Sequence, residues 1–182
     1  VMALTRLGLN QAVNLATNTT GTLAVANGGT GLSSGFINGT TNVGKVLQVE
    51  YFFTHANISS SSTSDAATIV TDQITPSATN SKILIWVDGG RGTYGPSGCE
   101  GTSKLYRQIG GGGFSELQVC HASQVVENGG YGKPSIAFNY VDTSHNTTSA
   151  IDYKIYIKTN TNTYHLNSGG AQIAMMLMEM AA

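Results

Sequence analysis

Two short segments of the sequence carry residue types that catalytic sites use, but each lacks the flanks that its chemistry needs. Residues 110–113 are four glycines, as in a phosphate-binding loop. A Walker loop ends in Gly-Lys-Ser/Thr ahead of a helix, whereas Phe114 and a strand-like segment follow here. Residues 31–35 (GLSSG) match the Gly-x-Ser-x-Gly of a nucleophile elbow, which lies between a buried strand and a helix. Because their flanks are glycine-rich and polar, we interpret this match as chance.

The ionisable side chains that could catalyse a reaction or bind a metal are scattered. The carboxylates of the second half are isolated in sequence, and no glycosidase pair stands out among Glu100, Glu116, Glu127 and Asp142. Cys120 and His121 are neighbours, but successive strand residues point to opposite faces, which argues against a thiolate–imidazole pair. The chain has no Cys-x-x-Cys and no His-x-x-x-His, so no zinc site is predicted. We expect no enzymatic activity, no metal and no cofactor.

The two cysteines, Cys99 and Cys120, lie on different segments of the chain. Small domains held together by disulfides are rich in cysteine, and a chain of 182 residues can bury a core without them. We therefore expect two free, unreactive thiols in a reducing compartment. A single disulfide between the two cysteines is the alternative.

The composition limits the classes of partner. Only 10% of the residues are charged, and Lys+Arg 9 against Asp+Glu 10 gives a net charge of -1. Nucleic acid is not an expected partner, because a basic excess normally supplies the phosphate contacts. No apolar run approaches the roughly 18 residues of a membrane span, so no membrane insertion is expected. The 23 glycines and many hydroxyl and amide side chains indicate a chain that stays soluble without many charges.

Beyond residue 44 the sequence has the pattern of successive short strands. The predicted strands are 45–54, 67–74, 82–87, 103–109, 114–121, 135–141, 150–158, 163–166 and 172–180. The four glycines between the fourth and fifth of them indicate a hairpin. The run 82–87 (KILIWV) is typical of a strand buried on both faces, which would place Trp86 in the core. For 172–180 a nine-residue helix is the alternative, but the segment lacks a cap.

The first 43 residues differ from the rest. They contain one charged side chain, Arg6, and one aromatic, Phe36. Short apolar pairs alternate with small polar residues, a pattern that makes no core by itself. Another copy of the chain or another protein must therefore cover the apolar side chains. We predict two regions: an extended anchor or shaft segment, 1–43, and a β-sandwich domain, 44–182. A short helix over 3–16 is an alternative for part of the first region.

Five segments resemble a known family in their order along the chain. Residues 25–31 (VANGGTG) resemble the segment of bacteriophage tail fibres in which a thin shaft passes into a globular head. Residues 44–49, 74–85, 147–154 and 177–182 resemble a C-terminal head domain of such fibres, common in phages of marine bacteria and cyanobacteria. One departure lies at 142–145, where the family has a proline soon after the aspartate.

The resemblance implies an all-β protein of the virion, made in the host cytoplasm and assembled as a homotrimer with a jelly-roll-like head. It implies that residues 1–43 contact the other copies and other virion proteins. Glycine pairs there permit a close approach of backbones near the axis. The candidates for trimer or virion attachment are Leu4, Leu7, Leu9, Leu23, Val25, Asn27, Gly28, Gly29, Thr30 and Gly31.

A fibre head of this kind would recognise a host surface glycan or protein. Such sites combine aromatic faces with planar polar groups on rigidly mounted loops. The candidates lie in or beside two glycine-rich loops and are Arg91, Tyr94, His121, Asn128, Tyr131 and Lys133. Alternatively, Tyr94 and Tyr131 anchor their loops or contact other copies. The competing function is that of a capsid decoration, head-fibre or collar protein, whose role is structural and whose working surface is residues 1–43.

Overall fold

The computed structural model describes residues 45–91, 93–94, 100–124 and 135–182, which belong to one compact unit, Val43–Ala182. The regular elements among them are strands, and no described residue is helical. The strands are β1 Val46–Thr54, β2 Ile58–Ser60, β3 Ala66–Ile74, β4 Lys82–Gly89, β5 Thr93–Tyr94, β6 Glu100–Ile109, β7 Ser115–Gln124, β8 Ile136–Asp142, β9 Ile151–Thr159, β10 Tyr164–Asn167 and β11 Ile173–Met180. The predicted all-β class is confirmed for this part of the chain.

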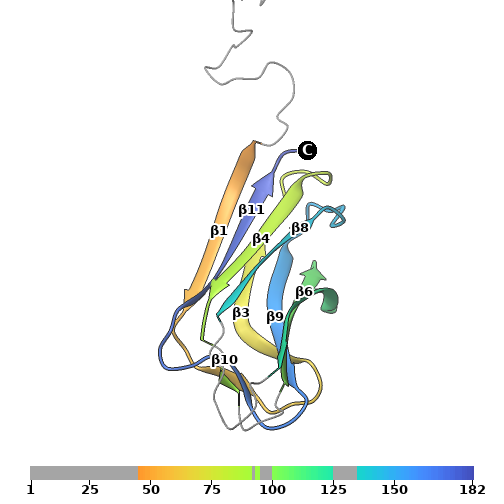
Figure 1. Cartoon of the computed structure of the whole chain (residues 1–182). Helices are drawn as coiled ribbons and strands as arrows, with labels where there is room; N and C mark the ends of the chain where they lie inside the picture. The colour runs from red at the N-terminus through yellow and green to blue at the C-terminus, as the bar shows by residue number, and fades with distance from the viewer. Residues whose placement is uncertain (1–44, 92, 95–99, 125–134) are drawn as a thin grey trace, which may run out of the picture. The chain divides into compact units, whose positions relative to one another are not determined.

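Two antiparallel four-stranded sheets pack face to face as a β-sandwich (Figure 1). Sheet 1 has the order β1-β11-β4-β8, and sheet 2 has the order β3-β9-β6-β7. A small end sheet, β2-β10-β5, lies at the end of the sandwich away from the C-terminus. When the eight strands of the two large sheets are numbered along the chain, their orders become 1-8-3-6 and 2-7-4-5. This is the strand order of a jelly roll, made of two Greek keys.

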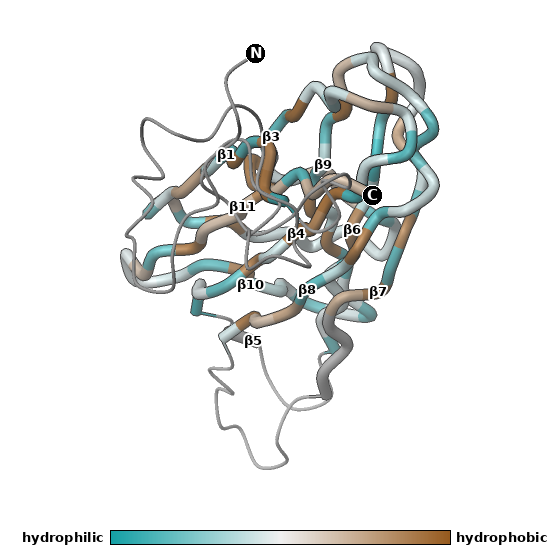
Figure 2. Tube along the Cα trace, turned by 90° about the horizontal axis from the view of Figure 1, so that it is seen from above, coloured by the Kyte–Doolittle hydropathy of each residue, from teal (hydrophilic) through white to brown (hydrophobic). Residues whose placement is uncertain are grey.

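The core lies between the two sheets and follows the alternation of the strands. In β9, Ile151, Tyr153, Ile155 and Ile157 all point inward and are at most 1% exposed, as the sequence pattern predicted. In β11, every second residue from Ile173 to Leu177 is buried in the same way. Figure 2 shows hydrophobic segments recurring along strands of both sheets. The strand prediction for the last segment is confirmed, and the helix alternative is wrong.

The hairpin predicted from the four glycines is also confirmed. β6 and β7 pair antiparallel, and the amide of Gly112 donates to the carbonyl of Ile109 at 3.0 Å. Gly110 and Gly111 have φ values of 56° and 76°. Positive φ at both central residues defines a type I′ turn, whose twist matches that of the flanking strands.

The prediction for 82–87 is wrong in one respect. Ile83, Ile85 and Val87 are fully buried, but Trp86 is 49% exposed and points to the outer side of sheet 1. The apolar run is continuous because both sides of this strand are apolar, although the described residues cover only one of them. Two strands escaped prediction, β2 and β5, because three and two residues are too few to show a period.

Candidate functional site

The loop after β4 starts from a backbone that only glycine can adopt without strain. Gly89 and Gly90 have φ values of 95° and 69°. The amide of Gly90 donates to the carbonyl of Gln172 at 2.6 Å, and a Cβ at Gly89 would lie 2.4 Å from that same oxygen. This close approach turns the chain sharply at the end of the sandwich and places Arg91 at the surface.

The main chain of Arg91 is held by hydrogen bonds, whereas its side chain is exposed. Its carbonyl accepts hydrogen bonds from the amide and the hydroxyl of Ser168, at 3.0 and 3.2 Å. Its side chain is exposed and lies against Gly169, with Nη1 3.4 Å from the place that a Cβ would take. Within the described residues the guanidinium has no ion-pair partner. It is therefore available to an anion or to a row of hydroxyl acceptors.

Asn167 forms an isolated parallel β-bridge with Arg91 and links two further loops. It is fully buried, and its Nδ2 donates to the carbonyls of Ala56 and Ala171, at 3.0 and 2.7 Å. Nδ1 of His55 lies 3.3 Å from the carbonyl of Gly170. The loop between β10 and β11 is thus tied to the loop before β2. The loops next to Arg91 are consequently held to one another by hydrogen bonds.

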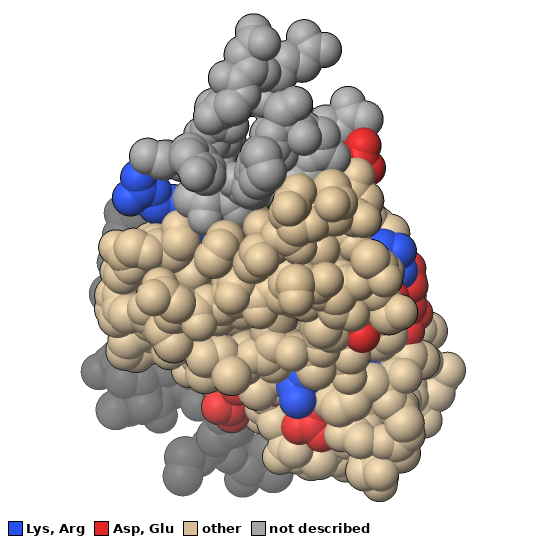
Figure 3. All heavy atoms as spheres, turned by 90° about the horizontal axis from the view of Figure 1, so that it is seen from below, with Lys and Arg blue, Asp and Glu red and all other residues tan. Residues whose placement is uncertain are grey.

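The surface of this end of the sandwich carries few charges. Figure 3 views the domain from below in the orientation of Figure 1, and Lys, Arg, Asp and Glu are sparse in the middle of that face. The loops there are made of Ser, Thr, Asn and Gly, and residues 159–172 contain no Lys, Arg, Asp or Glu. Hydroxyls and amides dominate the polar groups that this end offers to a ligand.

The structure places the receptor-contact candidates unequally. Arg91 is described in full. The backbone of Tyr94 pairs with Tyr164 in the end sheet, and that of His121 pairs with Ser103, but their side chains lie outside the described part of the chain. Asn128, Tyr131 and Lys133 lie outside it altogether. The ten trimer or virion-attachment candidates, Leu4 to Gly31, lie outside it as well, as does the helix alternative for 3–16.

The two glycine-rich loops leave the sandwich at one place. Glu100, the first residue of β6, pairs with Gln124, the last residue of β7. The loop that ends at Glu100 and the loop that follows Gln124 therefore have neighbouring attachment points.

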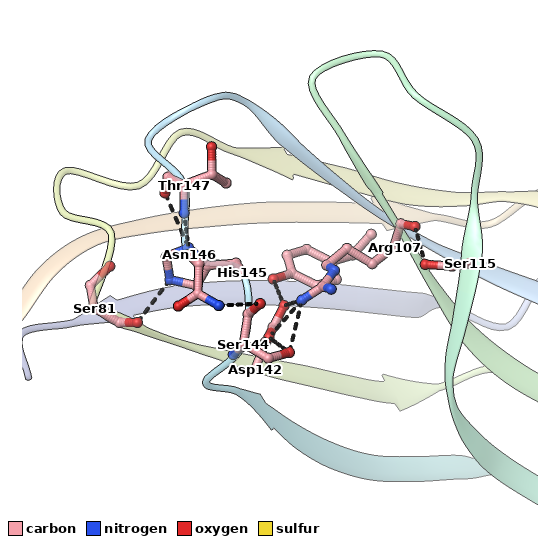
Figure 4. Close-up of polar contacts among 9 residues, drawn as sticks. Ser81, Arg107, Ser115, Asp142, Ser144, His145, Asn146 and Thr147 are labelled. Carbon is pink, nitrogen blue, oxygen red and sulfur yellow. Dashed lines mark hydrogen bonds and ion pairs between the residues drawn. The ribbon is translucent and has the colours of Figure 1, made fainter.

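Asp142 forms a buried polar cluster that the sequence did not reveal (Figure 4). Its carboxylate is fully buried and accepts hydrogen bonds from Nη1 of Arg107, at 2.9 and 2.7 Å, and from the hydroxyl of Tyr153, at 2.7 Å. The amide of Ser144 donates to Oδ1 at 2.9 Å. Burial raises the pKa of Asp142, but these bonds outweigh burial and hold the pKa below its ordinary value. A carboxylate so fully occupied serves structure and not acid–base catalysis.

The same carboxylate shapes the turn at 142–145, where the resemblance predicts a proline. The bond from the amide of Ser144 closes a turn on the side chain of Asp142, as aspartate does in many turns. His145 is buried, with Nε2 2.8 Å from the carbonyl of Ser81 and Nδ1 3.1 Å from that of Thr147. Side-chain hydrogen bonds thus hold this turn in place without a proline.

Glu179 is a second buried carboxylate at the same end of sheet 1, since Glu179 and Asp142 both pair with Ile83 of β4. It is fully buried on β11 and accepts from the amide and the hydroxyl of Ser77, at 2.7 and 2.9 Å, and from Nε2 of Gln48, at 2.6 Å. Burial raises the pKa of Glu179, but hydrogen bonds from Ser81, Gln48 and Ser77 outweigh it, and the pKa is lowered. This group also holds loops in place.

Cys120 is a free thiol, as predicted, and it is half-buried on β7. Burial raises the pKa of this thiol to about 12, so it is protonated and unreactive at neutral pH. Cys99 lies outside the described residues. Across the described ranges there is no group of three metal-ligating side chains. A search of the same residues for helices long and apolar enough to cross a membrane finds none.

Comparison with known proteins yields no family. No family model and no curated protein matches the chain. Among solved structures, one of infectious bursal disease virus, Gt strain, is similar over 84% of this chain, with a TM-score of 0.41 and 13% identity. One of the Gx strain is similar over 74%, with a TM-score of 0.33 and 13% identity. The matches cover only 42% and 37% of the viral chains. At these values the likeness shows neither a common family nor a common role.

Proposed function

We propose that the chain is a structural protein of a bacteriophage virion, a homotrimeric tail fibre whose head recognises a host surface glycan or protein. It catalyses no reaction. Residues 1–43 join the copies and attach them to other virion proteins. The head domain presents its receptor-binding end around Arg91. The resemblance of five ordered segments to phage fibres supports the family, and the jelly-roll strand order is compatible with it.

One observation carries the receptor role. Arg91 is an exposed cation without an ion-pair partner in the described ranges, and its carbonyl accepts hydrogen bonds from the amide and the hydroxyl of Ser168. A guanidinium is planar and offers five donors in a fixed geometry, which suits carboxylates and the hydroxyl pairs of sugars. The surrounding amide and hydroxyl groups extend this donor and acceptor surface without competing charges.

The competing role is that of a capsid decoration, head-fibre or collar protein. The exposed apolar side chains of sheet 1, Tyr51, Phe53 and Trp86 among them, favour it, since a particle component buries such surface against its neighbours. This role would require no receptor, and Arg91 would then be an ordinary surface residue.

Binding of the labelled full-length protein to a panel of marine bacteria and cyanobacteria tests the receptor role. Arg91→Ala should reduce binding by at least tenfold relative to the wild type. Lys45→Ala is the matched control, because Lys45 is an exposed cation at the opposite end of the sandwich, before β1. If Arg91→Ala bound as well as the wild type, Arg91 would not be a receptor contact.

Antibody labelling of intact particles decides between the two roles. Gold label at the tail tip supports the fibre, and label distributed over the capsid or at the collar supports the competitor. Light scattering tests the trimer separately, because a stable monomer near 19.0 kDa contradicts it.

A further inference from the structure

The outer side of sheet 1 carries a continuous apolar surface. Cross-strand neighbours form three rows over four strands, since every second residue of each strand points outward. The rows are Val49–Met178–Leu84–Val141, Tyr51–Met176–Trp86–Asn139 and Phe53–Ala174–Asp88–Ala137. Only Asn139 and Asp88 are polar among these twelve positions. We call this surface the apolar face.

Within the part of the chain that the structure describes, the side chains of the apolar face are accessible to solvent. Tyr51 is 56% exposed, Phe53 54% and Trp86 49%, and Val49 and Val141 are nearly as open. The side chains of the central strand, Met176 and Met178, are half-buried between their neighbours. With strands about 4.8 Å apart and about 3.4 Å per residue, the three rows cover roughly 400 Å² in plan. This is within the size range of the largest apolar patch on a monomer, which is often functional.

The composition of this surface is unusual for a sheet that faces water. An antiparallel sheet that faces water normally alternates between apolar residues inside and polar residues outside. Sheet 2 is closer to this rule: Lys104 on β6 bonds Asp65 and Glu116 on its outer side, at 3.0 and 2.7 Å. Among its described positions, only Ile69 and Val119 are large exposed hydrophobic residues. Sheet 1 breaks the rule on four adjacent strands at once, which a chance scatter of exposed hydrophobic residues does not do.

We propose that the apolar face of sheet 1 packs against a second copy of this chain. The face is nearly free of charge, since Asp88 is the one charged residue among its twelve positions. Copies arranged about a threefold axis can therefore bring this face against a neighbouring copy with little electrostatic repulsion. Met176 and Met178 at the centre adapt their shape to the opposing surface, as methionines do at binding surfaces.

The start of the domain makes another copy the nearest available partner. β1 forms the edge of the apolar face, and it directly follows residues 1–43, which the proposed function joins between copies. Copies joined there hold their β1 strands at high effective concentration. This is needed, because roughly 400 Å² is only half of the ~800 Å² per partner of a standard interface. The inference rests on the proposed assembly of several copies and adds which surface of the head they share.

The only tryptophan of the chain reports on this surface, because Trp86 lies in its middle row. We expect the assembled full-length protein to emit at short wavelength, with acrylamide quenching several-fold weaker than for an exposed indole. The double variant Tyr51→Lys/Phe53→Lys places charge on β1 and should shift the emission to the red and restore quenching. Ile69→Lys is the matched control, since Ile69 is 52% exposed on β3 of sheet 2; it should leave the emission unchanged.

The outcomes separate this inference from the proposed function. A trimer by light scattering whose Trp86 is quenched like a free indole overturns the inference and leaves the trimer joined through residues 1–43. A Trp86 that stays shielded after dilution to monomers also overturns it, because the first 43 residues of the same chain would then cover the face. A shielded Trp86 that becomes exposed on dilution supports it, whether or not Arg91 contributes to host binding.

Discussion

The outer sides of the two sheets of the sandwich differ in the residues that they expose. The outer side of sheet 2 carries a network of charged and aromatic groups. Tyr106 stacks on Tyr156 with ring centroids 4.1 Å apart. Nζ of Lys154 lies 4.9 Å from the ring centroid of Phe114. The outer side of sheet 1 carries Val, Met, Leu, Tyr, Phe and Trp instead. The inner sides of both sheets are equally apolar and share one core. The strand order alone therefore does not determine whether the outer side of a sheet is charged or apolar.

The contact that locks the two sheets together should have the largest single effect on stability. Asp142 belongs to sheet 1, whereas its partners Arg107 and Tyr153 belong to sheet 2. Asp142→Ala leaves a largely buried guanidinium without its counter-ion, which costs about 3–5 kcal/mol. Urea unfolding measures this loss. Asp88→Ala, on the outer side of sheet 1, should change the free energy of unfolding by less than about 0.5 kcal/mol. Equal effects of the two variants would contradict the locking role.

Neighbouring residues of β4 sharpen the comparison of inner and outer sides. Ile85 is fully buried between the sheets, and Trp86 is half exposed on the apolar face. Ile85→Ala should lower the free energy of unfolding by about 3 kcal/mol at any protein concentration. Trp86→Ala should cost about 1 kcal/mol in dilute solution. Its cost should grow as the protein concentration rises, because assembly stabilises the folded chain. A cost that is independent of concentration would contradict burial of Trp86 by another copy.

The acid stability of sheet 1 should depend on Glu179. Because its pKa in the folded chain lies below the ordinary 4.5, the ionised carboxylate stabilises the fold above that pH, and the contribution is lost as the pH falls through the folded value. Glu179→Gln should cost about 1–3 kcal/mol at pH 7, since it leaves a buried donor unpaired. The gap between wild type and variant should narrow below pH 4.5, as measured by urea unfolding at several pH values. A gap that stays constant would show that the pKa of Glu179 is the same in the folded and unfolded chain, and would contradict the lowered pKa.

The charged outer side of sheet 2 should contribute least. Lys104 bonds both Asp65 and Glu116, and the hydroxyl of Tyr106 donates to Asp65 at 2.6 Å, so that the pKa of Tyr106 is raised to about 12 by this bond and by burial. Ion pairs near the surface are nevertheless weak. Lys104→Met should lower the free energy of unfolding by about 1 kcal/mol or less, and the loss should shrink further in 1 M salt. A loss above about 2 kcal/mol, unaffected by salt, would place this network among the core contacts.

The sequence predicted the long strands from alternation, as in 150–158, or from an unbroken apolar run, as in 82–87. Ile151, Tyr153, Ile155 and Ile157 of β9 alternate cleanly, and the glycines at 110–113 mark the separate hairpin between β6 and β7. The same method placed Trp86 in the core, since a period cannot tell burial within the chain from burial against another chain. Once the outer side of sheet 1 is seen as apolar too, the unbroken run 82–87 is explained.

The polar supports of the candidate site could not be predicted in this way. Arg107 and Tyr153 lie 35 and 11 residues from Asp142 along the chain, and no local pattern links them. Asn167 is one of many asparagines, and only the fold shows that it is the buried one that forms a β-bridge with Arg91. Arg91 itself was found because a cation in a long glycine-rich segment is conspicuous in a chain with so few charges.

The pairing of the first and last strands has a mechanical consequence. The amide of Ala181 donates to the carbonyl of Lys45 at 2.8 Å, and β1 runs from there along β11 toward the end that carries Arg91. If a particle pulls on the chain ahead of β1 while Arg91 holds a cell, the load runs parallel to the strands. All hydrogen bonds between β1 and β11 then share the shear at once, instead of opening one after another. Such a head would resist detachment forces best in the direction in which a tethered particle pulls.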